Sequence, residues 1–376
     1  MNYKPIIIVP GEPNSIFFEL FFKVIKKEIK SPIILIASRN LITKQAKILK
    51  KKFSFSTTSE LEIIKNKNNL KGINLIDVNF NQASGFSKIT SKSNHYVSKC
   101  FGIAIKLLKN NVSNKFINGP ISKKTFLKNK YNGITEYLAK KTKTKKFAMI
   151  IYNKNLSVCP LTTHLPIKYV SKKINKLEII NKVKLINSFW KKKFGKQVKI
   201  GVTGLNPHCE SIDNFNEDKN IILPTIKKLK NLKYKIEGPF AADTIFIKNN
   251  RKKFDLIIGM YHDQVLTPIK TLFEYDAINI TIGLPFMRVS PDHGPNESML
   301  GKNKSNYLSF FNFLIVGKIM FLSSLKLSIL SQWGFNPVTP IFIFLPNSFF
   351  QKLSISFTLL IISNLFIFLL TYLIGR

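Results

Sequence analysis

The sequence predicts an α/β fold built around a mainly parallel sheet. Over roughly the first 290 of its 376 residues, short apolar runs rich in β-branched residues alternate with longer amphipathic segments. This order is typical of strand–helix–strand crossover units. Several runs end directly in polar turns, as at 10–13 and 203–206. The composition, 45% hydrophobic and 21% charged, supplies enough apolar material for a core, and the length suits two domains.

The first expected strand, Ile6–Val9, is an apolar run that ends at Pro10-Gly11. It is too short for a signal peptide and suits a buried strand. Further strands are expected at Ile33–Ala37, Lys115–Asn118, Ala148–Tyr152, Ser157–Pro160, Lys199–Thr203, Asp255–Gly259 and Ala277–Thr281. Amphipathic patterns between them predict helices, including Phe17–Lys30, His95–Lys109, Lys176–Lys193 and Lys219–Asn231. Ligands of open α/β sheets gather beyond the carboxyl ends of the strands, so polar residues in the following turns are candidates for function.

The chain is strongly basic, with 59 Lys+Arg, 20 Asp+Glu and a net charge of +39. Only four of the cations are arginine, the residue that best matches phosphate geometry, and the lysines are spread along the whole chain. We interpret the charge as a general lysine bias on solvated faces, so no specific nucleic-acid partner is predicted. The apolar content excludes a disordered polycation. Three scattered cysteines exclude a disulfide scaffold and favour a reducing compartment.

The C-terminal tail, 321–376, differs from the rest of the chain. It carries only three cations and no acid, and Phe357–Ile374 is nearly all apolar. Eighteen residues reach the lower limit of a bilayer-spanning helix. The tail predicts a membrane anchor that tethers an otherwise cytoplasmic protein to the inner membrane. The alternatives are a helix buried in the protein and a sequence that has lost its original ending.

Three of the five histidines follow predicted strands, namely His164, His208 and His262. Three imidazoles from three strand ends are what a metal site with an open coordination position needs. Such a site suits Zn²⁺ or another first-row divalent ion, which polarises a hydroxyl or carbonyl group. The alternative for each histidine is a structural role.

A second cluster of polar residues contains Lys270, Asn279 and Arg288. Arg288 follows the stiff, apolar segment 283–286, and bidentate binding of a phosphate or carboxylate is a natural role for it. The alternative is a structural ion pair. Neither a dinucleotide-binding G-x-G-x-x-G motif nor a P-loop occurs. Weak candidates for phosphate or nucleotide binding are segment 118–123 and Asp292-His293-Gly294.

Taken together and in order, several motifs resemble the 4-hydroxythreonine-4-phosphate dehydrogenase family of vitamin B6 biosynthesis. The resemblance covers about residues 5–320. The motifs that carry it are Pro10-Gly11-Glu12-Pro13, Gly119-Pro120-Ile121-Ser122-Lys123, Thr135-Glu136-Tyr137-Leu138, Thr162-Thr163-His164-Leu165-Pro166, Gly204-Leu205-Asn206-Pro207-His208, Gly238-Pro239-Phe240-Ala241-Ala242-Asp243-Thr244, Tyr261 to Lys270, and Asn279 to Arg288.

The resemblance implies a two-domain fold like that of isocitrate and isopropylmalate dehydrogenases, with the active site in the interdomain cleft of a homodimer. The expected first domain is discontinuous (1–117 and 272–320), and the second (118–271) carries the metal ligands and the dimer interface. The resemblance assigns metal binding and catalysis to the three histidines, with Lys270 also catalytic. It assigns substrate binding to Thr135, Lys270, Asn279 and Arg288, and cofactor binding weakly to Asp292, His293 and Gly294.

The implied reaction is NAD-dependent oxidation of 4-hydroxy-L-threonine 4-phosphate, with NADP as the alternative cofactor. Decarboxylation to 3-amino-2-oxopropyl phosphate follows. Zn²⁺ is the expected metal, with Mg²⁺ or Co²⁺ as alternatives. One departure from the family pattern is Ile134, which occupies the position of a histidine expected to touch substrate. It keeps two alternatives open: a dehydrogenase of threonate or erythronate 4-phosphate, and a catalytically impaired, membrane-tethered homologue.

Overall fold

The computed structural model describes residues 4–25, 31–127, 130–131, 133–290, 294–308 and 310–311. The tail 321–376 lies outside the described residues, as do Asp292 and His293. Within the described ranges, no helix is both long and apolar enough to cross a membrane.

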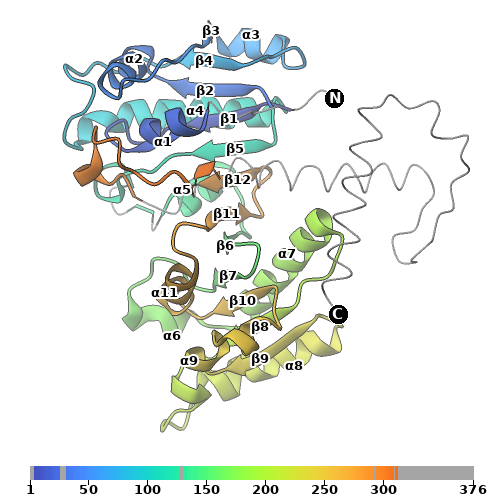
Figure 1. Ribbon diagram of the computed structural model, residues 1–376. Helices are drawn as coiled ribbons and strands as arrows, with labels where there is room; N and C mark the ends of the chain where they lie inside the picture. Colours follow the sequence, from blue (N-terminus) through green and yellow to red (C-terminus); the bar gives the residue numbers. More distant parts are fainter. Residues whose placement is uncertain are drawn as a thin grey trace, which may run out of the picture. The chain divides into compact units, whose positions relative to one another are not determined.

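The described residues form one twelve-stranded sheet in the order β3-β4-β2-β1-β5-β12-β11-β6-β7-β10-β8-β9 (Figure 1). The strands are β1 Ile6–Val9, β2 Ile33–Ala37, β3 Ser56–Thr58, β4 Ile73–Asp77, β5 Lys115–Asn118, β6 Ala148–Tyr152, β7 Ser157–Pro160, β8 Ile200–Thr203, β9 Ile236–Phe240, β10 Leu256–Gly259, β11 Ile278–Ile282 and β12 Met287–Ser290. All eight expected strands form, within one residue at each end.

The helices are α1 Phe17–Val24, α2 Arg39–Ile48, α3 Glu60–Lys65, α4 Asn94–Lys109, α5 Ile134–Lys141, α6 Val170–Lys173, α7 Lys176–Phe194, α8 Leu223–Asn231, α9 Ala242–Ile245, α10 Lys248–Arg251 and α11 His262–Phe273. Local sequence sets their ends. Helix α7 begins where the Asn175 side chain accepts from Glu178 N, and it ends at Gly195, whose φ of 68° suits glycine. The expected helix from Lys219 begins instead as a π-helical turn, Asp218–Ile222, that runs into α8.

The predicted mainly parallel α/β architecture is confirmed. Most neighbouring strands pair in parallel; the exceptions are β11 with β12, β11 with β6, and β6 with β7. The predicted boundaries 117/118 and 271/272 of a discontinuous first domain stay a prediction.

The central strands are buried on both faces. In β1, Ile6 and Ile8 join one apolar cluster with residues of α1, whereas Ile7 and Val9 join another with residues of α4. Successive side chains of a strand point to opposite faces, so helices cover both sides of this strand. That arrangement explains why the first strand is an uninterrupted apolar run.

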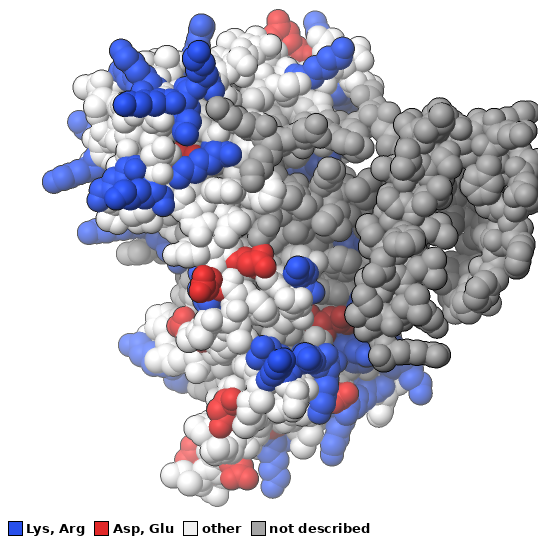
Figure 2. All heavy atoms as spheres, in the orientation of Figure 1, with Lys and Arg blue, Asp and Glu red and all other residues white. Residues whose placement is uncertain are grey.

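Lysine and arginine side chains lie over both the upper and the lower part of the face shown in Figure 2, with acidic side chains between them. This scatter favours the interpretation of the charge as a solvated, lysine-rich surface. The absence of a specific nucleic-acid partner stays a prediction.

Candidate active site

Three neighbouring strands bring the histidine-bearing turns to one edge of the sheet. Strand β10 pairs in parallel with β7 on one side and with β8 on the other. The turn after β7 carries His164, the first residue of α11 after β10 is His262, and the turn after β8 carries His208. Because the strands are parallel and adjacent, all three turns leave the same edge.

Two of the three histidines lie together. The ring centroids of His164 and His262 are 5.2 Å apart, with the planes tilted by 37°. His262 Nδ1 lies 3.0 Å from Asp263 Oδ1, a contact that orients the imidazole. Burial, together with the nearby Lys123 ammonium, lowers the pKa of His164 to about 4. His164 is therefore neutral at pH 7, the form in which imidazole binds a metal ion.

His208 is not part of this pair. It is exposed, and its φ of 53° places it in a left-handed turn. Among the described residues, no group of three or more His, Cys, Asp or Glu side chains is arranged to hold a metal ion. The two clustered histidines fit a divalent ion, since His164 Nδ1 is buried and has no hydrogen-bond partner. The third ligand stays a prediction.

Arg288, on β12, is 1% exposed. Its Nε donates to Asn118 Oδ1 (2.7 Å), and its Nη1 donates to Thr281 Oγ1 (2.9 Å) and Thr135 Oγ1 (3.3 Å). Among the described residues it forms no ion pair within 4.0 Å. Burial lowers its pKa to about 9, while the Glu136 carboxylate acts in the opposite direction. A buried guanidinium held by neutral oxygens favours anion binding over the structural ion pair.

The other predicted substrate contacts divide into two groups. Thr135, at the start of α5, is buried. Its Oγ1 and the Oγ1 of Thr281 on β11 both accept hydrogen bonds from Arg288 Nη1. Asn279 lies two residues before Thr281 on the same face of β11, and its Oδ1 is buried without a partner. Lys270 is exposed on α11, two turns beyond His262.

Glu136, which was not predicted as a site residue, connects the histidine pair with Arg288. Its Oε1 accepts from Thr163 Oγ1 at 2.8 Å, next to His164, while its Oε2 is buried without a partner. Its charge influences the pKa of both Arg288 and His164. The carboxylate is therefore close enough to one residue of each predicted cluster to act on its pKa.

Gly133 makes this close approach sterically possible. A Cβ atom there would lie 2.9 Å from Glu136 Oε2 and 3.0 Å from His164 Nδ1. Gly133→Ala is expected to lower the free energy of unfolding by about 1–3 kcal/mol because it overpacks this contact. Denaturation by urea would measure the change.

Gly102 provides the control, because nothing lies within 4 Å of an added Cβ on this exposed position of α4. Gly102→Ala is expected to stabilise the protein by about 0.5–1 kcal/mol. Equal effects of the two substitutions would contradict the close packing around Gly133.

The structure adds little support to the two weak candidates for phosphate or nucleotide binding, segment 118–123 and residues 292–294. Segment 118–123 leads into a π-helical turn of five residues, Lys123–Leu127, rather than into a long helix. Asn118 contributes through its side chain, by accepting from Arg288. Of the expected cofactor loop, only Gly294 is among the described residues.

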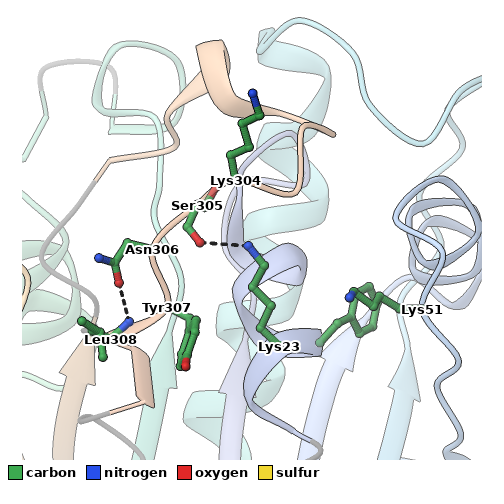
Figure 3. A pocket seen from close by; sticks show the side chains of 8 residues that line it. Lys23, Lys51, Lys304, Ser305, Asn306, Tyr307 and Leu308 are labelled. Atoms are coloured by element: carbon green, nitrogen blue, oxygen red, sulfur yellow. Dashed lines mark hydrogen bonds between the residues drawn. The ribbon is translucent and has the colours of Figure 1, made fainter.

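A pocket of about 670 Å³ lies elsewhere, beside the end of α1 and residues 304–308 (Figure 3). None of the predicted site residues lines it. Within it, the Lys23 ammonium donates to Glu19 Oε1, Asn303 O and Ser305 O, each at 2.9 Å. These bonds use all three ammonium protons, so Lys23 has a structural role.

Comparison with known proteins gives a consistent result. The family model "Pyridoxal phosphate biosynthetic protein PdxA" matches residues 28–314. A 4-hydroxythreonine-4-phosphate dehydrogenase of Sulfurihydrogenibium sp. is 36% identical over 79% of this chain and 92% of its own length. The enzyme of that name from Aquifex aeolicus is 33% identical over 83% and 96%. An Oceanobacillus iheyensis protein provisionally named D-threonate 4-phosphate dehydrogenase is 30% identical over 80% and 93%.

A solved structure also resembles the chain closely. A protein from Salmonella typhimurium, provisionally named 4-hydroxythreonine-4-phosphate dehydrogenase, superposes with a TM-score of 0.71 at 25% identity, covering 84% of this chain and 99% of that one. The predicted resemblance is thereby confirmed. The chain belongs to the PdxA family of pyridoxal phosphate biosynthetic proteins, whose relatives are named as dehydrogenases, a class of oxidoreductase.

Proposed function

We propose that the chain oxidises 4-hydroxy-L-threonine 4-phosphate with NAD, in a reaction that needs a divalent metal ion. Loss of CO₂ then gives 3-amino-2-oxopropyl phosphate for pyridoxal phosphate biosynthesis. The observation that carries the proposal is the pairing of an anion site with a metal-ligand site. The Glu136 carboxylate is close enough to buried Arg288 and to His164 to raise the pKa of each.

The histidine cluster would hold the ion. His164 and His262 would supply two imidazoles, and His208 would supply the third. When bound there, a divalent ion, Zn²⁺ by expectation, supplies Lewis-acid chemistry that acidifies an alcohol and stabilises negative charge on oxygen. Asp263 would keep the His262 ring oriented through the contact at Nδ1.

The remaining residues bind and orient the substrate. The Arg288 guanidinium offers charge-assisted donors to an anionic group of the substrate, and Thr135 and Thr281 fix its plane. The unpartnered Oδ1 of Asn279 would accept a hydrogen bond from a substrate hydroxyl or ammonium group. Lys270 would bind a second anionic group, and residues 292–294 would contact NAD. Fixing these groups together reduces the entropy lost on reaching the transition state.

We also propose a cytoplasmic homodimer in which the domains 1–117 with 272–320 and 118–271 enclose the site. The position of His208 apart from the histidine pair suits a site that a partner subunit completes. The tail 321–376 would tether this dimer to the inner membrane.

Steady-state formation of NADH tests the proposal. Purified protein with Zn²⁺ should reduce NAD with 4-hydroxy-L-threonine 4-phosphate, and activity should disappear when a chelator removes the metal. The control is the same assay with unphosphorylated 4-hydroxythreonine, which lacks the anion for Arg288. No NADH from the phosphorylated substrate would refute the proposed reaction.

The second candidate function is oxidation of threonate or erythronate 4-phosphate. Ile134 favours it, because this half-buried side chain packs against the apolar cluster beside α4 and can neither donate a hydrogen bond nor carry charge. The Oceanobacillus relative supports the same substrate class. A higher kcat/KM with either acid than with hydroxythreonine phosphate would establish this alternative.

Ile134→His is expected to raise kcat/KM for hydroxythreonine phosphate by about ten-fold, because a hydrogen bond to a charged group contributes roughly 1.5–3 kcal/mol. The comparison variant is Ile134→Gln, which adds a donor without an ionisable ring. An unchanged kcat/KM in both variants would show that Ile134 is not at a substrate contact.

A further inference from the structure

Glu136 of α5 and Arg288 of β12 carry opposite charges that lie close together without forming an ion pair. Burial lowers the pKa of the Arg288 guanidinium to about 9, and the Glu136 carboxylate is near enough to oppose that shift. Among the described residues, no ion pair within 4.0 Å joins the two groups. Each charge can therefore still bind a charge of opposite sign on a ligand.

Neutral hydroxyl groups, rather than the opposite charge, hold each of the two side chains. Arg288 Nη1 donates to Thr281 Oγ1 at 2.9 Å and to Thr135 Oγ1 at 3.3 Å. Glu136 Oε1 accepts from Thr163 Oγ1 at 2.8 Å. Hydroxyl groups orient a charge without neutralising it, and a buried charge without a counter-charge is costly. A ligand that carries both an anionic and a cationic group would offset this cost at both side chains.

The second carboxylate oxygen of Glu136 lacks a hydrogen-bond donor. Oε2 is buried without a partner, whereas the side chain as a whole is only half-buried. A Cβ atom on Gly133 would lie 2.9 Å from Oε2, so a larger residue there would crowd the carboxylate. The terminal torsion of glutamate is soft, so Oε2 can turn towards a ligand at the exposed part of the side chain. An ammonium group there would supply the missing donor.

We infer that Glu136 binds the ammonium group of the substrate, and that this contact makes the site selective for a phosphorylated hydroxy-amino acid over the corresponding hydroxy acid. This inference rests on the proposed function. 4-Hydroxy-L-threonine 4-phosphate and D-threonate 4-phosphate share a carboxylate, a phosphate and the hydroxyl group to be oxidised. They differ at carbon 2, where the first carries an ammonium group and the second a hydroxyl group. The ammonium group forms the stronger, charge-assisted hydrogen bonds to a carboxylate.

Glu19 offers a matched control. It also has a buried Oε2 without a hydrogen-bond partner, while its Oε1 accepts from Lys23 Nζ at 2.9 Å. It belongs to α1 and to neither predicted cluster of site residues. Glutamine has nearly the shape of glutamate, and its amide oxygen can still accept from Thr163 at position 136. The same substitution at both positions therefore removes a charge with little change in packing.

The experiment measures the Kd of each compound for the full-length protein by isothermal titration calorimetry, with neither metal nor NAD added. Wild type should bind hydroxythreonine phosphate at least about ten-fold more tightly than D-threonate 4-phosphate. Glu136→Gln should weaken binding of hydroxythreonine phosphate by about 10–100-fold and change that of D-threonate 4-phosphate by less than about three-fold. Glu19→Gln should leave both Kd values within about three-fold of wild type.

The outcomes are distinguishable. Equal weakening of both compounds in Glu136→Gln would overturn the inference and assign the carboxylate to orienting His164 or to stability. Unchanged binding in Glu136→Gln would also overturn it, as would a wild-type protein that binds hydroxythreonine phosphate no more tightly than D-threonate 4-phosphate. Selective binding that depends on Glu136, without NADH formation from hydroxythreonine phosphate, would refute the proposed reaction and leave this inference standing.

Discussion

Arg288→Met is expected to lower kcat/KM for the phosphorylated substrate about a thousand-fold, which corresponds to roughly 4 kcal/mol of lost transition-state binding. Arg288 is 1% exposed, and its hydrogen bonds to Asn118, Thr135 and Thr281 hold the guanidinium in one orientation. A fixed, desolvated cation binds an anion more strongly than a surface lysine does, because no solvent competes. Steady-state kinetics would measure the loss.

The same substitution should not destabilise the protein. Burial lowers the pKa of Arg288 to about 9, well below that of a solvated guanidinium, so the folded state disfavours the proton that the unfolded state binds. This penalty is fully present below about pH 9 and disappears as the pH rises from there towards the pKa of a solvated guanidinium. At pH 7, methionine removes the buried charge, and the two threonine hydroxyls can bond to each other across their 3.3 Å separation. We expect the Tm to rise or to stay within about 3 °C of wild type.

Arg251→Met is the control for both measurements. This arginine ends α10 and donates to Phe246 O at 2.7 Å, outside the site. Its replacement should leave kcat/KM within about two-fold of wild type. If Arg288→Met lost activity and stability together, the guanidinium would be a structural group rather than an anion site.

The sequence predicted the buried strands more successfully than those at the sheet edges. Apolar runs such as Ile33–Ala37 predict strands because both faces are covered, and the structure has that strand at those bounds. Four strands were missed. Two of them, β4 and β12, lie inside the sheet, and the other two are its edges: β3 is a short polar strand, and β9 contains Gly238-Pro239. Proline is tolerated at an edge because one side of the strand needs no ladder hydrogen bonds.

The candidate site was only partly predictable, because a local sequence pattern does not reveal contacts between distant parts of the chain. His164, His262 and Arg288 stand out because each is rare in this chain and lies in a strand-end turn or a stiff segment. Glu136 and Thr281 act through contacts between distant segments: the bond from Thr163 to Glu136 spans 27 positions and that between Thr135 and Thr281 spans 146. No local pattern reports such a contact. Glu136 could have been found through its place in the Thr-Glu-Tyr-Leu motif.

Substituting His164 with alanine should have the second large effect, the loss of both metal and activity. The substitution removes one imidazole of the pair and leaves His262 as a lone ligand beside Asp263. A single neutral imidazole does not retain a divalent ion against water, so metal content should fall below about one tenth per chain and kcat/KM by at least a thousand-fold. Elemental analysis and steady-state kinetics on the same preparation would measure the two changes.

His95→Ala is the matched control, because His95 is exposed on α4 and belongs to neither cluster. It should keep both metal and activity.

His208→Ala then tests the third ligand, whose turn leaves the same sheet edge as the turn of His164 without joining the pair. If His208 completes the site, this variant should lose the metal as His164→Ala does. If His208→Ala instead keeps stoichiometric metal, the metal ligands of the protein are limited to His164 and His262. If His164→Ala remains active, the reaction takes place at a site that does not include His164.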